Sequence, residues 1–239
     1  MEIDFSGKVV IVTGAAGALG SAVSLAFHQA RAKVSYVDRA GERMERLAAQ
    51  VAQDPEHNLV VCADLMKAAG AEQMAGEVVD HFGGIDILVN TVGGYRAGKP
   101  LHETTDETWN LMLDLNARTV YNSCKAVIPH MLRARTGAIL SVGARPGLSG
   151  ARNMAAYSVS KAAVLRMTES MAAELKDAGI RVNCILPGTI DTAANRKDMP
   201  DADHSRWVEP ESLAGVILFL CSDLARDISG AALPVYGKS

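Results

Sequence analysis

Seven short apolar segments recur along the chain at regular intervals. Each is rich in β-branched residues and apolar along its whole length, which is typical of strands buried on both faces of a parallel sheet. The segments span residues 8–13, 33–37, 58–62, 85–90, 137–142, 180–186 and 230–235. The pattern therefore predicts seven strands joined by crossover connections.

Helix-compatible stretches lie between these strands, at residues 17–30, 41–53, 67–82, 104–133, 154–177 and 210–222. Thr104 and Glu107 predict a capping box, and Pro210 suits a first helical position. Strands and helices that alternate at this spacing require right-handed crossovers. We expect one α/β domain over residues 1–239, with a Rossmann-type, doubly wound, seven-stranded parallel sheet and helices on both faces.

Composition narrows the function classes. The formal net charge is −3 and no basic stripe is present, so nucleic acid is not an expected partner. No apolar run could span a bilayer, and the acidic start of the chain differs from a signal peptide; we expect a cytoplasmic protein. Four cysteines (62, 124, 184 and 221) and six histidines are scattered, which predicts buried thiols and no metal site.

A glycine-rich turn, "TGAAGALG" (residues 13–20), connects the first strand to the first helix. Glycines there let the backbone approach a pyrophosphate, which sits on the amides of the helix N-terminus. Asp38 ends the second strand, where a carboxylate accepts hydrogen bonds from both ribose hydroxyls and repels a 2′-phosphate. NAD(H) is thus favoured over NADP(H), although Arg39 could pair with that phosphate. A helix cap is the alternative role for Asp38.

Further motifs make the chain resemble the short-chain dehydrogenase/reductase family over essentially its whole length. The motifs are "TGAAGALG", "CADL", "LVNTVGG", "LDLNA", "YSVSK", "ILPGTIDT" and "DISGAALPV". Ala18 stands where many members have glycine, and "NTVG" stands where they commonly have Asn-Asn-Ala-Gly. The resemblance implies an NAD(P)-dependent oxidoreductase that acts on a small molecule and forms a homo-oligomer, a tetramer or a dimer.

The resemblance also implies roles for individual residues. Asp64 would contact adenine, Asn90 and Gly93 would line the nucleotide groove, and four residues would hold the nicotinamide end. The implied cofactor-binding set is Gly14, Gly17, Leu19, Gly20, Asp38, Arg39, Asp64, Leu65, Asn90, Gly93, Tyr157, Lys161, Pro187, Gly188, Ile190 and Thr192. Tyr157 would be the acid/base residue, Lys161 its electrostatic partner and ribose ligand, and Asn116 part of a water-bridged proton relay.

The chemistry of these residue types agrees with the implied roles. Tyr157 and Lys161 are four residues apart, hence on one helix face. A free tyrosine has a pKa of about 10. We expect a nearby ammonium and the nicotinamide cation to lower the pKa of Tyr157. Asn116 falls inside the stretch 104–133, where asparagine is a poor helix former, and its alternative is a solvated polar residue.

The family's usual catalytic serine is missing. It precedes the tyrosine by thirteen positions, and counting back from Tyr157 gives Ala144. Ser141 has the wrong offset and should point to the opposite face, while Ser149 lies in a glycine-rich loop. Loss of one positioned donor costs about 10²–10³ in rate when an oxyanion forms. It matters less when the hydride acceptor is a conjugated nitrogen heterocycle, because the charge spreads over ring nitrogens.

Residues 186–207 form a polar stretch long enough to be a substrate lid, at about 189–207. The stretch is similar to the corresponding segment of dihydropteridine reductases, which also lack the serine. Tyr95 and Trp207 would then be stacking partners for a flat substrate ring; packing that anchors the lid is the alternative. Arg196 and His204 are expected to be solvated lid residues.

Three functions follow from these residues. The first is an NAD(H)-dependent enzyme that reduces a quinonoid dihydropterin or a similar conjugated imine. The second is a carbonyl or alcohol dehydrogenase, similar to 3-oxoacyl-carrier-protein reductases, with a site that lacks the serine. The third is a non-catalytic NAD(H)-binding protein, against which the presence of Asn116, Tyr157 and Lys161 argues.

Overall fold

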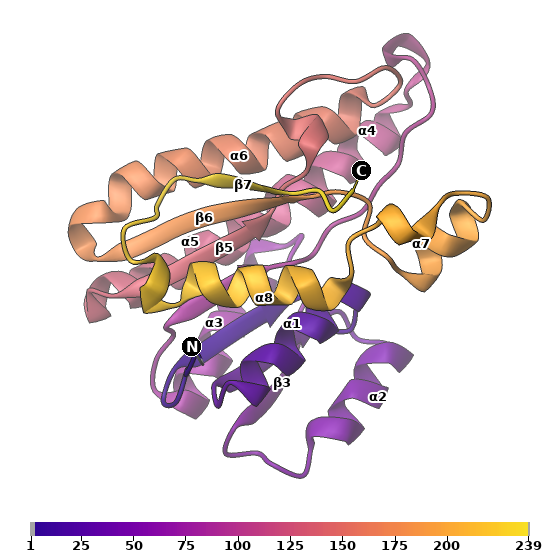
Figure 1. The fold of residues 1–239 in the computed structure, drawn as a ribbon. Helices are drawn as coiled ribbons and strands as arrows, with labels where there is room; N and C mark the ends of the chain where they lie inside the picture. Colours follow the sequence, from indigo (N-terminus) through magenta and orange to yellow (C-terminus); the bar gives the residue numbers. More distant parts are fainter. Residues whose placement is uncertain (1–2, 239) are drawn as a thin grey trace.

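A seven-stranded, wholly parallel sheet forms the middle layer of the computed structural model, which describes residues 3–238 (Figure 1). The strand order is β3-β2-β1-β4-β5-β6-β7. The strands are β1 (Val9–Thr13), β2 (Lys33–Asp38), β3 (Asn58–Cys62), β4 (Ile87–Asn90), β5 (Gly137–Val142), β6 (Ile180–Pro187) and β7 (Ala232–Val235). All seven predicted strands are therefore present, and the predicted Rossmann-type α/β fold is confirmed.

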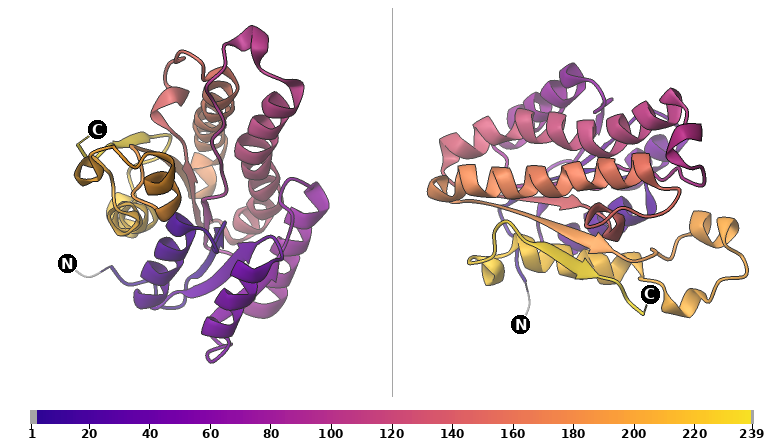
Figure 2. Two further views of the ribbon diagram at one scale, coloured as in Figure 1. Left: turned by 90° about the vertical axis from the view of Figure 1, so that its right-hand side faces the viewer. Right: turned by 90° about the horizontal axis from the view of Figure 1, so that it is seen from above.

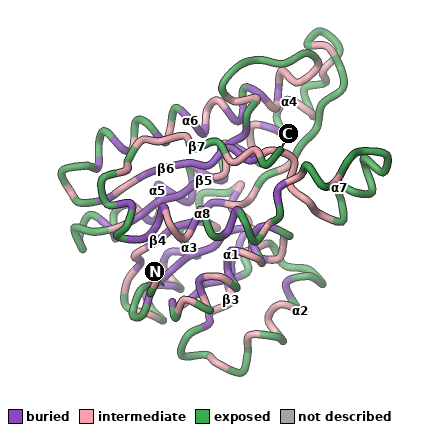
Figure 3. The backbone as a smooth tube through the Cα atoms, in the orientation of Figure 1, coloured by how far each residue is buried: buried purple, intermediate pink, exposed green. Residues whose placement is uncertain are grey.

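Helices cover both faces of the sheet (Figure 2). One face carries α1 (Ala18–Gln29), α2 (Glu42–Val51) and α8 (Pro210–Cys221), whose apolar side chains share a core with the strands. The other face carries α3 (Ala68–Phe82), α5 (Thr119–Ala134) and α6 (Ala155–Leu175), around a second core. The inner strands are buried by both layers, which explains why their sequences are apolar throughout (Figure 3).

The two edge strands, β3 and β7, contain exposed residues, although the sequence predicts strands that are buried on both faces. Leu233 and Pro234 in β7 are exposed, as is Cys62 at the end of β3. An edge strand has one neighbour and less cover, and proline is tolerated there because no ladder partner needs its missing N–H. The prediction that all four cysteines are buried is thus wrong for Cys62, while Cys124, Cys184 and Cys221 are buried.

The predicted helix 104–133 is divided into two by a π-helical turn. Helix α4 (Asp106–Leu113) leads into a π turn (Asp114–Arg118), and α5 follows directly. The predicted capping box is wrong by one residue, because Thr105 rather than Thr104 accepts the N–H of Thr108. The hydroxyl of Thr104 instead donates to the carbonyl of Pro100. Single π turns inside helices often mark functional sites.

The segment expected to be a lid has structure of its own. It contains α7 (Ala193–Asp198) and one turn of 3-10 helix (His204–Arg206), and it extends away from the body of the molecule near the carboxyl end of β6 (Figure 1). Its two ends are joined, since Ile190 and Val208 form a β-bridge and the N–H of Asp191 donates to the carbonyl of Val208. The segment is therefore a structured insertion whose two ends are hydrogen-bonded to each other, not an irregular loop.

The strand order reverses between β1 and β4. From β1 the chain proceeds to β2 and β3 on one side, and from β4 to β5, β6 and β7 on the other. Ligands of such sheets bind outside the carboxyl ends of the strands at this point. Within residues 3–238, no helix has the length and apolar character needed to cross a membrane.

Candidate active site

The glycine turn after β1 is built so that helix α1 starts directly against it. Gly14 has φ +70°, a conformation that L side chains rarely adopt. A Cβ on Gly20 would lie 2.1 Å from the carbonyl oxygen of Gly14, so only glycine lets the first turn of α1 pack on this loop. Leu19 is buried and holds α1 on the sheet core. The turn therefore leaves the amides at the start of α1, which follow Gly17, beside the carboxyl ends of the strands.

A cavity of about 710 Å³ lies at the carboxyl ends of the strands around the switch point. Predicted cofactor-binding residues that line it are Gly14, Gly17, Asp38, Arg39, Asp64, Leu65 and Gly93. Other lining residues were not predicted: Ala16, Ala40, Gly41, Glu42, Arg43, Met44, Ala63, Met66, Thr91, Val92, Leu115 and Thr119. Most are chain neighbours of predicted residues, whereas Leu115 lies in the π turn and Thr119 directly follows it. The groove suits an extended dinucleotide.

Asp38 presents a partly buried carboxylate to this groove. Its Oδ2 accepts the N–H of Ala16 at 3.1 Å, and its Oδ1 accepts the N–H of Arg39 at 2.8 Å. Helix α2 is capped at Gly41, so Asp38 does not cap it. The Arg39 side chain is exposed. Further along the groove, Asp64 is anchored by the N–H of Met66, 3.2 Å from its Oδ1.

Asn90 does not line the groove with its side chain, contrary to the prediction. The side chain is buried, and its Nδ2 donates to Ser141 Oγ at 3.3 Å and to Cys124 Sγ at 3.6 Å. Asn90 thus connects β4 to β5 and α5 in the interior. The same bond places the Ser141 hydroxyl inside the fold, while Ser149 is exposed.

The π turn places Asn116 at the centre of a hydrogen-bond cluster. Its Oδ1 accepts the N–H of Gly94 at 2.9 Å, and its Nδ2 donates to the carbonyl of Gly94 at 3.0 Å and to Ser160 Oγ at 3.1 Å. The residue is completely buried, which excludes the alternative of a solvated asparagine. Ser160, which the sequence analysis did not identify, donates in turn to the carbonyl of Tyr157 at 2.7 Å.

Lys161 points from α6 toward the same cluster. Its Nζ donates to the carbonyl of Val142 at 2.8 Å, and burial lowers its pKa to about 8. A Cβ placed on Gly93 would lie 3.0 Å from Asn116 Oδ1 and 3.4 Å from Lys161 Nζ. Both polar groups therefore converge on the backbone of Gly93, at the inner end of the cofactor groove.

Tyr157 lies one turn before Lys161 on α6, as the spacing predicts. Burial raises its pKa to about 12, with a smaller contribution from the nearby Tyr95 phenol. The lowering expected from the ammonium and the nicotinamide cation is not seen in the chain by itself, because burial of the phenol is the largest cause of the shift in its pKa. The Tyr157 phenol is consequently protonated at neutral pH, as a proton donor requires.

Ala144 places a buried methyl group where the family's serine is expected, between β5 and the first turns of α6. Its backbone is extended, and it starts a single turn of 3-10 helix at residues 145–147. That turn packs on α6, since a Cβ on Gly147 would lie 2.9 Å from the carbonyl carbon of Lys161. The position is therefore held close to α6 but offers no hydroxyl.

The residues predicted to hold the nicotinamide lie at the end of β6 and lead into the lid segment. Gly188 is fixed by β7, through its N–H to the carbonyl of Val235, and Pro187 ends the strand. Ile190 belongs to the bridge that closes the lid segment. Thr192 uses its hydroxyl to cap α7, accepting the N–H of Asn195 at 3.1 Å.

The aromatic candidates lie in different surroundings. Tyr95 packs edge-on against Tyr157, with ring centroids 4.9 Å apart. Trp207 packs on His204 within the lid segment, at 4.4 Å, as in the anchoring alternative. Arg196 is exposed on the lid segment, as expected of a solvated residue, and pairs with Asp191 through two bonds of 2.6 Å. His204 is half-buried and also bonds the carbonyl of Met199.

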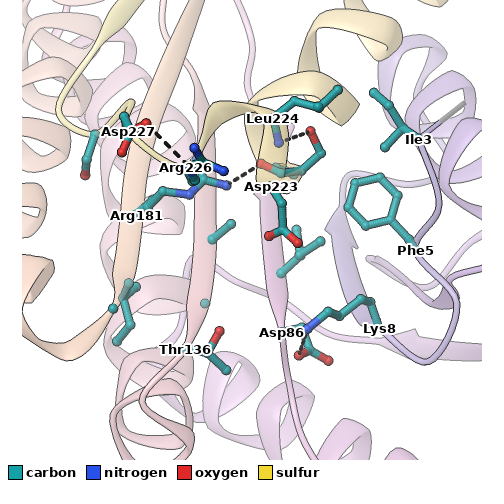
Figure 4. A pocket seen from close by; sticks show the side chains of 18 of the residues that line it. Ile3, Phe5, Lys8, Asp86, Thr136, Arg181, Asp223, Leu224, Arg226 and Asp227 are labelled. Atoms are coloured by element: carbon teal, nitrogen blue, oxygen red, sulfur yellow. Dashed lines mark hydrogen bonds and ion pairs between the residues drawn. The ribbon is translucent and has the colours of Figure 1, made fainter. Parts of the chain in front are cut away.

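A second cavity, of about 500 Å³, lies at the amino ends of the strands (Figure 4). Arg181 lines it, and its guanidinium donates to the carbonyls of Leu220 and Ser222 at the end of α8. Lys8 pairs there with Asp86. These groups are used within the fold, and the cavity is at the opposite edge from Tyr157. Among residues 3–238, no cluster of ligating side chains could hold a metal ion.

The fold and this site define a nucleotide-binding oxidoreductase architecture, and comparisons with known proteins identify the family. Residues 8–203 match the family model described as short chain dehydrogenase. The chain is 34% identical to a D-threitol dehydrogenase from Mycolicibacterium smegmatis, with 99% of this chain and 96% of that protein covered. It is 32% identical to a 3-oxoacyl-[acyl-carrier-protein] reductase from Thermotoga maritima, with 97% of each covered.

A solved structure shows the same likeness. A crystal structure of an NAD⁺-bound xylitol dehydrogenase superposes with a TM-score of 0.89 at 26% identity, and 98% of this chain and 99% of that chain are covered. The chain therefore belongs to the short-chain dehydrogenase family and is an NAD(P)-dependent oxidoreductase, as its sequence predicts.

Proposed function

We propose that this protein is an NAD(H)-dependent oxidoreductase that reduces a conjugated C=N bond, as in a quinonoid dihydropterin or a similar imine. The observation that carries the proposal is Ala144, a buried methyl group at the position of the family's hydroxyl donor. A ketone needs a donor there because negative charge grows on one oxygen. A conjugated imine spreads that charge over several ring atoms, so the site can function without it.

The groove residues support NAD(H) as the cofactor. The glycine turn allows a pyrophosphate to approach the start of α1, and Asp38 offers a carboxylate to ribose hydroxyls. That carboxylate would repel a 2′-phosphate. Arg39 also lines the groove, but its side chain is exposed to water, where an ion pair with that phosphate would be weak. NADH bound in this groove would supply the hydride.

The residues of the chain then supply the proton. Tyr157 is protonated at neutral pH and donates its phenolic proton to the ring nitrogen, which balances the hydride added to the carbon. The charge of Lys161 stabilises the tyrosinate that remains, and this is a larger effect in a buried site than in water. The Asn116 cluster holds the backbone between Gly93 and Tyr95 in place beside Lys161.

The named relatives favour a second candidate, a carbonyl or alcohol substrate. The relatives described above are named as dehydrogenases of polyols and as a reductase of oxoacyl groups. In that case water or a backbone amide would take the place of the serine hydroxyl.

We further propose that the protein acts in the cytoplasm as a homo-oligomer. Of the methionines on α4 and α6 that could contact another subunit, Met112 is buried within its own chain, whereas Met167 and Met171 are half-buried.

The deciding experiment is steady-state NADH oxidation with quinonoid dihydropterin and with a panel of ketones. Each acceptor is tested with the wild type, Tyr157→Phe and Ala144→Ser. Turnover of the pterin that is lost in Tyr157→Phe and not improved by Ala144→Ser supports the imine proposal. Ketone turnover that rises by about 10²-fold in Ala144→Ser supports the second candidate instead. NADH binding without turnover of either class would indicate a non-catalytic protein.

A further inference from the structure

Tyr95 is held in place by backbone bonds on both sides. Gly94 exchanges two hydrogen bonds with the buried side chain of Asn116, and the N–H of Arg96 donates to Met112 Sδ at 3.3 Å. A Cβ on Gly94 would lie 2.6 Å from Leu115 Cδ2, so a side chain at that position would require the Leu115 side chain of the π turn to shift. Although Tyr95 is on the surface, its backbone has the fixed geometry that a positioned group requires.

The side chain of Tyr95 packs against Tyr157, the proposed proton donor. The two rings are nearly perpendicular, at 83°, with centroids 4.9 Å apart. Tyr95 is 59% exposed, so its hydroxyl remains accessible to a ligand. Among the hydrogen bonds formed within residues 3–238, neither the Tyr95 nor the Tyr157 hydroxyl takes part. Two tyrosine rings whose hydroxyls have no hydrogen bond within the described residues therefore contact each other at the proposed active site.

We propose that the Tyr95 hydroxyl donates a second hydrogen bond to the substrate atom that Tyr157 protonates, in place of the hydroxyl missing at Ala144. The inference rests on the proposed function, because it takes Tyr157 as the proton donor. It assigns Tyr95 a polar role instead of ring stacking: the edge-on contact already engages its ring with Tyr157, whereas the hydroxyl has no other partner. The hydrogen-bond donor that is missing at Ala144, after β5, would then come from the loop after β4.

The test compares Tyr95→Phe, which removes only the hydroxyl, with Tyr95→Leu, which also removes the ring. Tyr121→Phe is the matched control, since Tyr121 is an exposed tyrosine on α5. Each variant is assayed for kcat and KM with the acceptor that the wild type reduces fastest, and for NADH affinity by fluorescence titration. Ala144→Ser is then added to Tyr95→Phe, to ask whether a hydroxyl at residue 144 restores the lost rate.

We expect Tyr95→Phe to lower kcat by about tenfold, which is less than the 10²–10³-fold loss of a donor to an oxyanion, because a conjugated imine spreads the charge and the group is exposed to water. NADH affinity should not change, and adding Ala144→Ser to Tyr95→Phe should restore most of the lost kcat. A Tyr95→Phe variant with wild-type kcat would overturn the inference, and a loss of affinity for the acceptor in Tyr95→Leu alone would assign stacking. A wild type that reduces no acceptor would instead refute the proposed function itself.

Discussion

Asn116 should stabilise the fold as well as the site, and Asn116→Ala tests this directly. The side chain is completely buried and makes four hydrogen bonds, two with Gly94, one with Ser160 and a long one of 3.8 Å to Met112 Sδ. A hydrogen bond contributes about 0.5–1.5 kcal/mol net, and buried partners left without one cost more. Alanine recovers a little of this through its higher helix propensity.

The expected loss is therefore about 2–3 kcal/mol in the free energy of unfolding. For a chain of this size, that corresponds to a decrease in Tm of roughly 5–10 °C. Thermal and urea unfolding followed by circular dichroism measure it. Hydrogen exchange at the amides of Gly94 and Arg96 should increase as well, because both depend on the π turn region for their partners.

Asn122→Ala is the matched control, since Asn122 is a buried asparagine of α5 with one hydrogen bond, to the carbonyl of Leu65 at 2.8 Å. It should lose about 1 kcal/mol. If Asn116→Ala were no less stable than Asn122→Ala, the cluster would not anchor the loop, and Asn116 would not fix the backbone around Tyr95.

Three other predictions follow from the cofactor groove and the catalytic helix. The pKa of Lys161 is lowered from 10.5 to about 8, so between these values the unfolded chain binds the extra proton and stability rises with pH. The wild type should gain about 3 kcal/mol relative to Lys161→Met from pH 7.5 to pH 10.5 in urea unfolding, and parallel curves would contradict this. Gly20→Ala should abolish NADH binding and destabilise the fold, because its Cβ would overlap the Gly14 carbonyl, whereas Gly76→Ala in α3 meets open space and should be neutral or stabilising in the same assays. Asp38→Asn should weaken NADH and strengthen NADPH binding, by about tenfold in the ratio of their Kd values, and an unchanged ratio in fluorescence titration would remove Asp38 from cofactor selection.

The sequence predicted the parts of the site that depend on local spacing. Tyr157 and Lys161 share a helix face because helical geometry fixes residues four apart. The glycine turn is recognisable because positive φ and close packing exclude side chains at Gly14 and Gly20. Asn90 was misplaced because its position at a strand end is compatible with the groove or the interior. Its bond to Ser141, 51 residues away, decides for the interior.

The sequence by itself determined the doubly wound sheet, the groove at its switch point, the helix that carries Tyr157 and Lys161, and the absence of a hydroxyl at Ala144. These follow from hydrophobic period, turn chemistry and residue identity, which are local properties. Only the tertiary structure decided that a π turn buries Asn116 against Gly94 and that Tyr95 lies on Tyr157. It also decided that burial raises the pKa of Tyr157 and lowers that of Lys161. Those features depend on contacts and desolvation between segments distant in the chain, and no local pattern encodes them.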